Sequence, residues 1–184
     1  MGLPSVVTAP SPVAELSFES IFQAELSYVW NSLYRLGVSE RDVEDMTHEV
    51  FLQVHRQLDT YDRSRPVRPW LFGFCHRVAA DYRRLARHRT VLVGDSGELE
   101  RWDRQFDRNP NERFEAVELV HLALARLDFD QRAVFVLHDI DGCTMNEAAS
   151  VLQIPVNTAY SRLRLARARF AAVVRKMVPE GRGT

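Results

Sequence analysis

Apolar residues recur at intervals of three and four positions through most of this chain, which is the spacing of amphipathic α-helices. On this basis we expect an all-α protein built from several separate helices. The expected helices run from about Pro12 or Ser17 to Leu36, from Glu40 to Leu58, from Pro69 to about Arg89, from about Glu112 to Leu127, and from Asp128 to near His138.

Residues typical of helix ends support several of these limits. Gly37 is expected to end the first helix, because glycine readily adopts the backbone conformation that closes helices. Ser39 is expected to cap the second helix and Pro69 to open the third. Asp128 and Gln131 have the spacing of a capping box, in which side chains satisfy the free backbone donors of a first turn.

The stretch from Thr144 to Phe170 divides into a short helix, a tight break and a longer helix. Thr144 and Glu147 have capping-box spacing. Pro155 disfavours helical geometry at the residue before it and suits the first position of a new helix. In that second helix, one stripe is apolar and should face the core; it consists of Ala159, Leu163, Ala166 and Phe170.

The opposite side of this last helix is polar and basic. Asn157, Tyr160, Ser161 and Arg164 lie roughly opposite the apolar stripe, and residues 156–176 include six basic residues and no acidic one. Uncompensated positive charge favours an anionic partner. Two helices joined by a short turn, the second one basic, indicate a helix-turn-helix that enters the DNA major groove. The alternative is a solvated amphipathic helix of a bundle.

A second polar stripe follows the third helix and includes Trp70, Arg77, Asp81, Arg84 and His88. Aromatic rings that stack on bases, together with arginines that bind phosphates, are what unpaired nucleic acid requires. The other interpretation is that Trp70 packs into the core while the arginines only keep the surface soluble. Periodicity alone leaves both interpretations open.

Segments without helical periodicity predict the domain limits. Residues 1–14 contain three prolines and are expected to be a disordered lead-in. Residues 90–112 gain Gly, Pro and Asn and are expected to be a flexible linker. The predicted domains are therefore residues 15–89 and 113–178, followed by a tail from 179 to 184.

Composition narrows the function classes. The 184 residues carry a net charge of −1, but acidic and basic residues alternate in blocks, which suggests separate surfaces for separate partners. Cys75 and Cys143 are isolated among apolar neighbours, and no signal peptide or membrane-spanning run is found, so we expect a cytoplasmic protein. No acid pair or nucleophile–base grouping indicates catalysis. We therefore expect neither an enzyme nor a metal or cofactor site.

Three stretches then suggest a family: DVEDMTHEVFLQVHRQLDTYD, RPWLFGFCHRVAADYRR and LDFDQRAVFVLHDIDGCTMNEAASVLQIPVNTAYSRLRLARARF. In this order they resemble bacterial RNA polymerase sigma factors of the extracytoplasmic-function (ECF) group of the sigma-70 family. The resemblance implies two small helical domains joined by a flexible linker, with the helix-turn-helix in the second. It also implies binding to core RNA polymerase, promoter recognition, promoter opening and transcription initiation at a specific regulon.

The resemblance also implies roles for individual residues. The N-terminal domain would bind the promoter −10 element through Tyr61, Arg63, Arg65, Trp70, Arg77, Asp81 and Arg84. The C-terminal domain would bind the −35 element through Asn157, Thr158, Tyr160, Ser161, Arg162, Arg164 and Arg167. The surface for the clamp helices of the polymerase β′ subunit would be Asp45, His48, Glu49 and Leu52. The β flap and an anti-sigma factor are the other implied partners.

The family pattern differs from this sequence at Gln153, which stands where glycine is common in the turn. A left-handed backbone there would cost a residue other than glycine about 1–2 kcal/mol.

The main alternative function is a helix-turn-helix regulator whose N-terminal domain senses a signal or dimerises. Such a protein would not need the Trp70 stripe and the Tyr61 loop. A nucleic-acid enzyme such as a recombinase would need a nucleophile and a metal or acid cluster, which we do not find.

Overall fold

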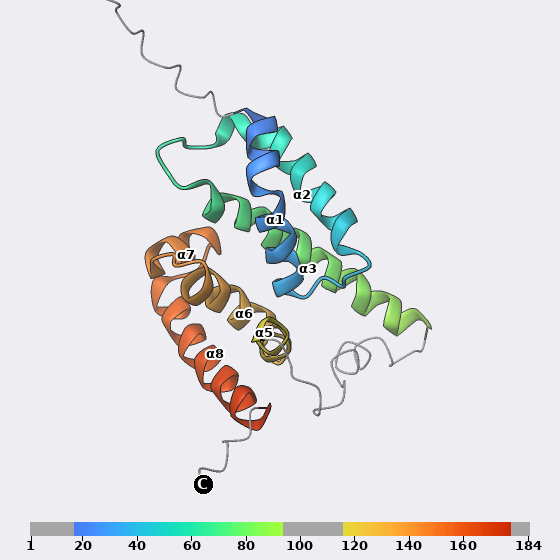
Figure 1. Ribbon diagram of the computed structural model, residues 1–184, viewed down its shortest axis with the longest axis vertical. Coiled ribbons are helices and arrows are strands. Elements are labelled where there is room, and N and C mark those ends of the chain that lie inside the picture. Colours follow the sequence, from blue (N-terminus) through green and yellow to red (C-terminus); the bar gives the residue numbers. More distant parts are fainter. Residues whose placement is uncertain (1–16, 94–115, 178–184) are drawn as a thin grey trace, which may run out of the picture.

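The computed structural model describes residues 17–93 and 116–177, and in these ranges the ordered elements are helices (Figure 1). The predicted all-α fold is confirmed. The elements are α1 (Phe18–Leu36), α2 (Val43–Gln57), the 3₁₀ turn η1 (Leu58–Thr60), α3 (Val67–Val93), α5 (Ala116–Ala125), α6 (Phe129–Phe135), the π-helical turn η2 (Val136–Ile140), α7 (Met145–Val151) and α8 (Val156–Met177). Among these described helices, none combines the length and apolar character needed to cross a membrane.

The helices form two blocks, which we call the N-terminal block (residues 17–93) and the C-terminal block (residues 116–177). In the N-terminal block α1, α2 and α3 all pack against one another. In the C-terminal block α8 packs on α5, α6 and α7. Buried side chains of both blocks belong to one continuous apolar cluster, since α1 and α3 also contact helices of the C-terminal block. The predicted division at a linker remains a prediction, because residues 94–115 lie outside the described ranges.

Several helix ends are those expected from the sequence. Ser17 caps α1 by accepting a hydrogen bond from the Ser20 backbone, and Gly37 closes the helix with a φ of 99°. Thr144 and Glu147 form the predicted capping box at the start of α7, with both reciprocal hydrogen bonds present. These ends depend on residues close in sequence, which is why local patterns located them.

The predicted start of the second helix at Glu40 was wrong. Residues 40–42 form a turn and α2 begins at Val43, with Asp42 rather than Ser39 at the cap position. The Ser39 hydroxyl instead donates to the Asp42 carboxylate at 2.6 Å, and the Tyr82 hydroxyl donates to the same carboxylate at 2.7 Å. Asp42 therefore does not cap α2 with its side chain. Its carboxylate links Tyr82 of α3 to the turn before α2.

Two further limits also differ from the prediction. The third helix begins at Val67, before Pro69, and continues to Val93, so residues 90–93 are helix and not linker. Asp128 stands at the N-cap of α6 but its side chain makes no capping hydrogen bond, so the second predicted capping box was wrong. The Asp128 carboxylate pairs with Arg169 of α8 instead. The Asp128 carboxylate therefore binds the Arg169 guanidinium and not the backbone N–H groups at the start of α6. The predicted lead-in, tail and helix start at residue 112 lie outside the described residues.

Candidate nucleic-acid interface

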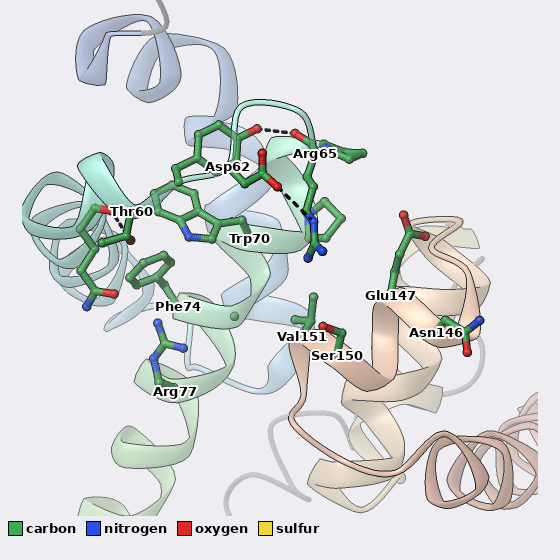
Figure 2. A pocket seen from close by; sticks show the side chains of 15 residues that line it. Thr60, Asp62, Arg65, Trp70, Phe74, Arg77, Asn146, Glu147, Ser150 and Val151 are labelled. Atoms are coloured by element: carbon green, nitrogen blue, oxygen red, sulfur yellow. Dashed lines mark hydrogen bonds and ion pairs between the residues drawn. The ribbon is translucent and has the colours of Figure 1, made fainter.

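A cavity of about 660 Å³ lies where the start of α3 and the loop after η1 face α7 (Figure 2). It is lined by polar and aromatic side chains from the N-terminal block on one side and by Asn146, Glu147, Ser150 and Val151 of α7 on the other. The lining residues that matter here are Tyr61, Asp62, Arg65, Trp70, Phe74, Arg77, Glu147 and Val151.

The loop at the mouth of the cavity is held by its own side chains. The Tyr61 hydroxyl donates to the Arg65 carbonyl oxygen at 2.5 Å. The Asp62 carboxylate accepts from the backbone and the hydroxyl of Ser64, at 3.0 and 2.7 Å, and it pairs with Arg65 at 3.4 Å. The bonds from Ser64 hold the pKa of Asp62 below its ordinary value. The loop therefore presents the Tyr61 ring in a fixed place.

Aromatic rings line the N-terminal side of the cavity. The Tyr61 and Trp70 ring centroids are 4.7 Å apart, and those of Trp70 and Phe74 are 4.9 Å apart. The Arg77 guanidinium lies over the Phe74 ring, 4.6 Å from its centroid. Trp70 is half-buried and packs against the core, but it also borders the cavity, so it combines features of both interpretations left open by the sequence.

The structure gathers only part of the residue set expected to bind the −10 element. Tyr61, Arg65, Trp70 and Arg77 border the cavity. Arg63 is exposed on the loop outside it. Asp81 and Arg84, further along α3, are exposed and pair with each other at 3.1 Å. The two groups share one helix but do not form a single pocket.

The polar side of α8 has the orientation predicted from its periodicity. Ala159, Leu163 and Ala166 are buried, while Asn157, Tyr160, Ser161 and Arg164 are exposed and Thr158 is half-buried. The turn before α8 contains Gln153 with a φ of 54°, which is the left-handed conformation anticipated for this position. This turn sets the angle between α7 and α8, as a helix-turn-helix requires.

Three arginines on the flank of α8 are paired with acids of the preceding elements. Arg162 donates to Asp130 at 2.6 Å, and Arg167 donates to both oxygens of Asp139 at 2.9 and 2.6 Å. Arg169 pairs with Asp128. The sequence did not reveal these acids as partners of α8, because the paired residues are 28 to 41 positions apart. The expected DNA-contacting residues Arg162 and Arg167 are thus partly neutralised.

The predicted polymerase surface lies on the outer side of α2. Asp45 and His48 are exposed, and Leu52 keeps 53% of its surface accessible, which is high for a large apolar side chain. Glu49 is half-buried and accepts a hydrogen bond from Gln53 at 2.9 Å. An accessible leucine beside carboxylates is consistent with a protein-binding surface, though single exposed leucines are common.

Comparisons with known proteins place the chain in a family. Residues 21–89 match the family model for sigma-70 region 2, and residues 118–170 match that for sigma-70 region 4. The sigma factor CnrH of Cupriavidus metallidurans is 32% identical over 145 residues, which cover 75% of this chain and 76% of that protein. The ECF sigma factor SigX of Bacillus subtilis is 25% identical, with coverage of 88% and 84% respectively.

Solved structures agree with this placement. CnrH in complex with the cytosolic domain of CnrY matches with a TM-score of 0.60 and 26% identity, covering 86% of this chain and 88% of that one. The sigma factor RpoE of Bartonella quintana, in complex with the anti-sigma factor NepR, has a TM-score of 0.64 at 20% identity and shows the shared fold. The chain therefore belongs to the sigma-70 family of RNA polymerase sigma factors, in its ECF group. Its function is to direct promoter-specific transcription initiation.

Proposed function

We propose that the N-terminal block captures an unpaired base of the promoter −10 element in the cavity beside Tyr61. The observation that carries this assignment is the joint presence of neighbouring aromatic rings and arginines around one opening. Stacking on an aromatic ring contributes about 1–3 kcal/mol per base, and arginines bind the backbone phosphates. Arg63, Asp81 and Arg84 would contact the same strand outside the cavity.

The C-terminal block would read the −35 element with the exposed side of α8. Side chains near the start of a recognition helix reach base edges in the major groove, whereas those on its flanks contact phosphates. Asn157, Tyr160, Ser161 and Arg164 belong to the first group by position. Thr158, Arg162 and Arg167 would fix the helix against the DNA backbone, the two arginines by exchanging a carboxylate partner for a phosphate.

The remaining partners are proposed on the same basis. Asp45, His48, Glu49 and Leu52 of α2 would dock on the clamp helices of the polymerase β′ subunit, and the C-terminal block on the β flap. The sigma factors in both solved complexes are bound to other proteins, one of them a named anti-sigma factor. An anti-sigma factor is accordingly proposed as a partner here. The protein would act in the cytoplasm and without catalysis of its own.

Transcription in vitro tests this function. The full chain is mixed with bacterial core RNA polymerase and genomic DNA fragments, and the start sites of the transcripts are mapped. The expected result is a small set of start sites, absent without the protein, with shared sequences near −10 and −35. The alternative regulator would give no start sites with core polymerase alone, and it would not co-elute with core polymerase on gel filtration.

A further inference from the structure

A leucine stands on the side of α8 that the proposed function turns toward DNA. Leu165 keeps 44% of its surface accessible, and Tyr160, at 57%, is the other large apolar or aromatic side chain of the described α8 with such exposure. The Tyr160 hydroxyl can exchange hydrogen bonds with water or with a polar partner. The Leu165 side chain has no polar atom, so any partner that contacts it favourably must offer an apolar group.

The buried residues around Leu165 in the sequence fix its place on the helix. Leu163 and Ala166 are buried, so the core side of α8 lies on either side of Leu165 in sequence but away from it in space. Ser161, four positions before, and Ala168, three positions after, are both exposed. Residues at these spacings are neighbours on a helix surface. Leu165 therefore lies within the outward side of α8 and not at the edge of the core.

Ion pairs mark the two borders of this outward side. Arg167 donates to both oxygens of Asp139, at 2.9 and 2.6 Å. Arg162 donates to Asp130 at 2.6 Å. By helical periodicity these two arginines fall on opposite borders of the buried side, each next to an acid of the elements beneath. The outward surface between the two borders contains Leu165.

A helix in the major groove has a phosphate backbone on each side and base edges in front of it. With α8 in the groove, Arg162 and Arg167 would face the two backbones, and Leu165 would face the base edges. Phosphates and most base-edge groups are polar. The one methyl group that the four bases present in the major groove is the C5-methyl of thymine, and apolar side chains contact it in protein–DNA complexes.

We propose that Leu165 is a specificity-determining residue of the −35 interface, which selects thymine by packing against its C5-methyl group. This inference rests on the proposed reading of the −35 element by α8. It goes further by naming a preferred base and the group on that base that is recognised. It also adds to the interface a residue that the sequence-based expectations did not include.

The surroundings of Leu165 favour DNA over a protein as the apolar partner. Its neighbours one turn away on the helix are Ser161, Arg162, Ala168 and Arg169. Protein-binding surfaces are usually contiguous apolar patches, whereas here a single leucine stands among a hydroxyl, a small residue and two arginines. A thymine methyl group between two rows of phosphates matches this combination of one apolar group and flanking positive charge.

Deoxyuridine tests the contact directly, because it pairs as thymidine does and lacks only the C5-methyl group. Holoenzyme made from core polymerase and the full chain first selects promoters from a library with random −35 sequences. Each thymine of the selected element, on either strand, is then replaced singly by deoxyuridine, and the Kd of the holoenzyme is measured. Wild type is expected to lose affinity about fourfold at one thymine, which is the effect of removing one buried methyl group.

Leu165→Ala should bind the selected promoter less tightly and should no longer distinguish thymidine from deoxyuridine at that position. Alanine favours helices at least as well as leucine does, and the side chain is exposed, so the variant should fold normally. Leu165→Met keeps an apolar side chain of similar size and should retain most of the distinction. Leu26→Ala is the matched control, because it removes a leucine of α1 that is 38% exposed, and it should respond to deoxyuridine as wild type does.

The outcomes separate this inference from the function on which it rests. Loss of the thymidine preference in Leu165→Ala, but not in Leu26→Ala, supports the contact. The contact is overturned if Leu165→Ala still distinguishes the two bases, if no thymine responds in wild type, or if the selected −35 elements share no thymine. Selected promoters that share no −35 bases at all would instead overturn the proposed reading of the −35 element by α8.

Discussion

Arg164 and Arg169 lie on the same helix but in different electrostatic surroundings. Arg164 is exposed on the outward side of α8, whereas Arg169 is paired with Asp128 on its flank. A good bidentate contact between arginine and a base contributes about 1–3 kcal/mol of discrimination, and a phosphate contact carries no direct sequence information. The two residues should therefore respond differently to replacement by alanine.

We expect Arg164→Ala to flatten the base preference at one or two −35 positions. Arg169→Ala should weaken all promoters about equally and lower the salt slope by at most about one unit, because Asp128 already offsets part of its charge. The measurement is holoenzyme binding to a library of −35 substitutions at two salt concentrations. Uniform losses for both variants, with wild-type base preferences, would show that Arg164 only holds a phosphate.

Tyr61 supplies both a ring and a hydroxyl to the cavity, and two substitutions separate them. Tyr61→Ala removes the ring whose centroid lies 4.7 Å from that of Trp70. This change should lower transcription from duplex promoters by the equivalent of about 1–3 kcal/mol. A template with a pre-melted −10 bubble should recover only part of this loss. Tyr61→Phe keeps the ring and loses only the bond to the Arg65 carbonyl oxygen. The transcription activity of Tyr61→Phe should therefore stay closer to that of wild type. Full activity of Tyr61→Ala on duplex DNA would show that Tyr61 does not belong to the site.

At the scale of single elements, α7 depends on its capping box. Thr144→Ala removes the hydroxyl that accepts from the Glu147 backbone, and should lower the free energy of unfolding by about 1 kcal/mol. Thr144→Ser is the control, because serine keeps a hydroxyl that can cap the helix. Chemical denaturation of both variants measures the difference. Equal stability of the two variants would mean that the box contributes nothing measurable.

The outer side of α2 can be tested by charge reversal. Because its other side is buried, Asp45→Arg with Glu49→Arg should leave the helical content intact while weakening binding to core polymerase. A control with the same change in net charge is Glu19→Arg with Asp59→Arg, at exposed positions of α1 and η1. Competition with a labelled wild-type protein for core polymerase gives the affinities. If the folded Asp45→Arg, Glu49→Arg variant competes for core polymerase as well as wild type does, the docking surface lies elsewhere.

The sequence predicted those features whose causes are local. The helix stripes, the glycine end of α1, the capping box of α7 and the outward side of α8 each depend on residues a few positions apart. Features set by distant residues were missed or misplaced. Tyr82 donates a hydrogen bond to Asp42, 40 positions away, and Arg169 pairs with Asp128, 41 positions away. Tyr28 donates to Asp141, 113 positions away. No local pattern marks such partners, so the contact between the blocks could only come from the structure.

At the scale of the whole molecule, two half-buried histidines make the contact between the blocks sensitive to pH. Burial lowers the pKa of His76, helped by Arg77 and Arg162 and opposed by Asp130. Burial and Arg35 lower the pKa of His121. The folded protein therefore binds fewer protons at these sites than the unfolded chain, so its stability falls as pH drops below about 6.5, the ordinary histidine value. Asp141 acts in the opposite sense at lower pH, because burial raises its pKa.

We therefore expect the melting temperature to fall between pH 7.5 and pH 5.5. The His76 ring of α3 stacks on Phe129 of α6, and the Tyr34 ring of α1 meets His121 of α5 edge-on. The double variant His76→Phe with His121→Phe keeps both aromatic contacts but cannot take up these protons, so its melting temperature should change less over the same range. Subtracting the two profiles removes the contribution of Asp141 and of every other group that the proteins share. A difference that stays constant across this range would show that the two histidines are not held neutral by the contact between the blocks.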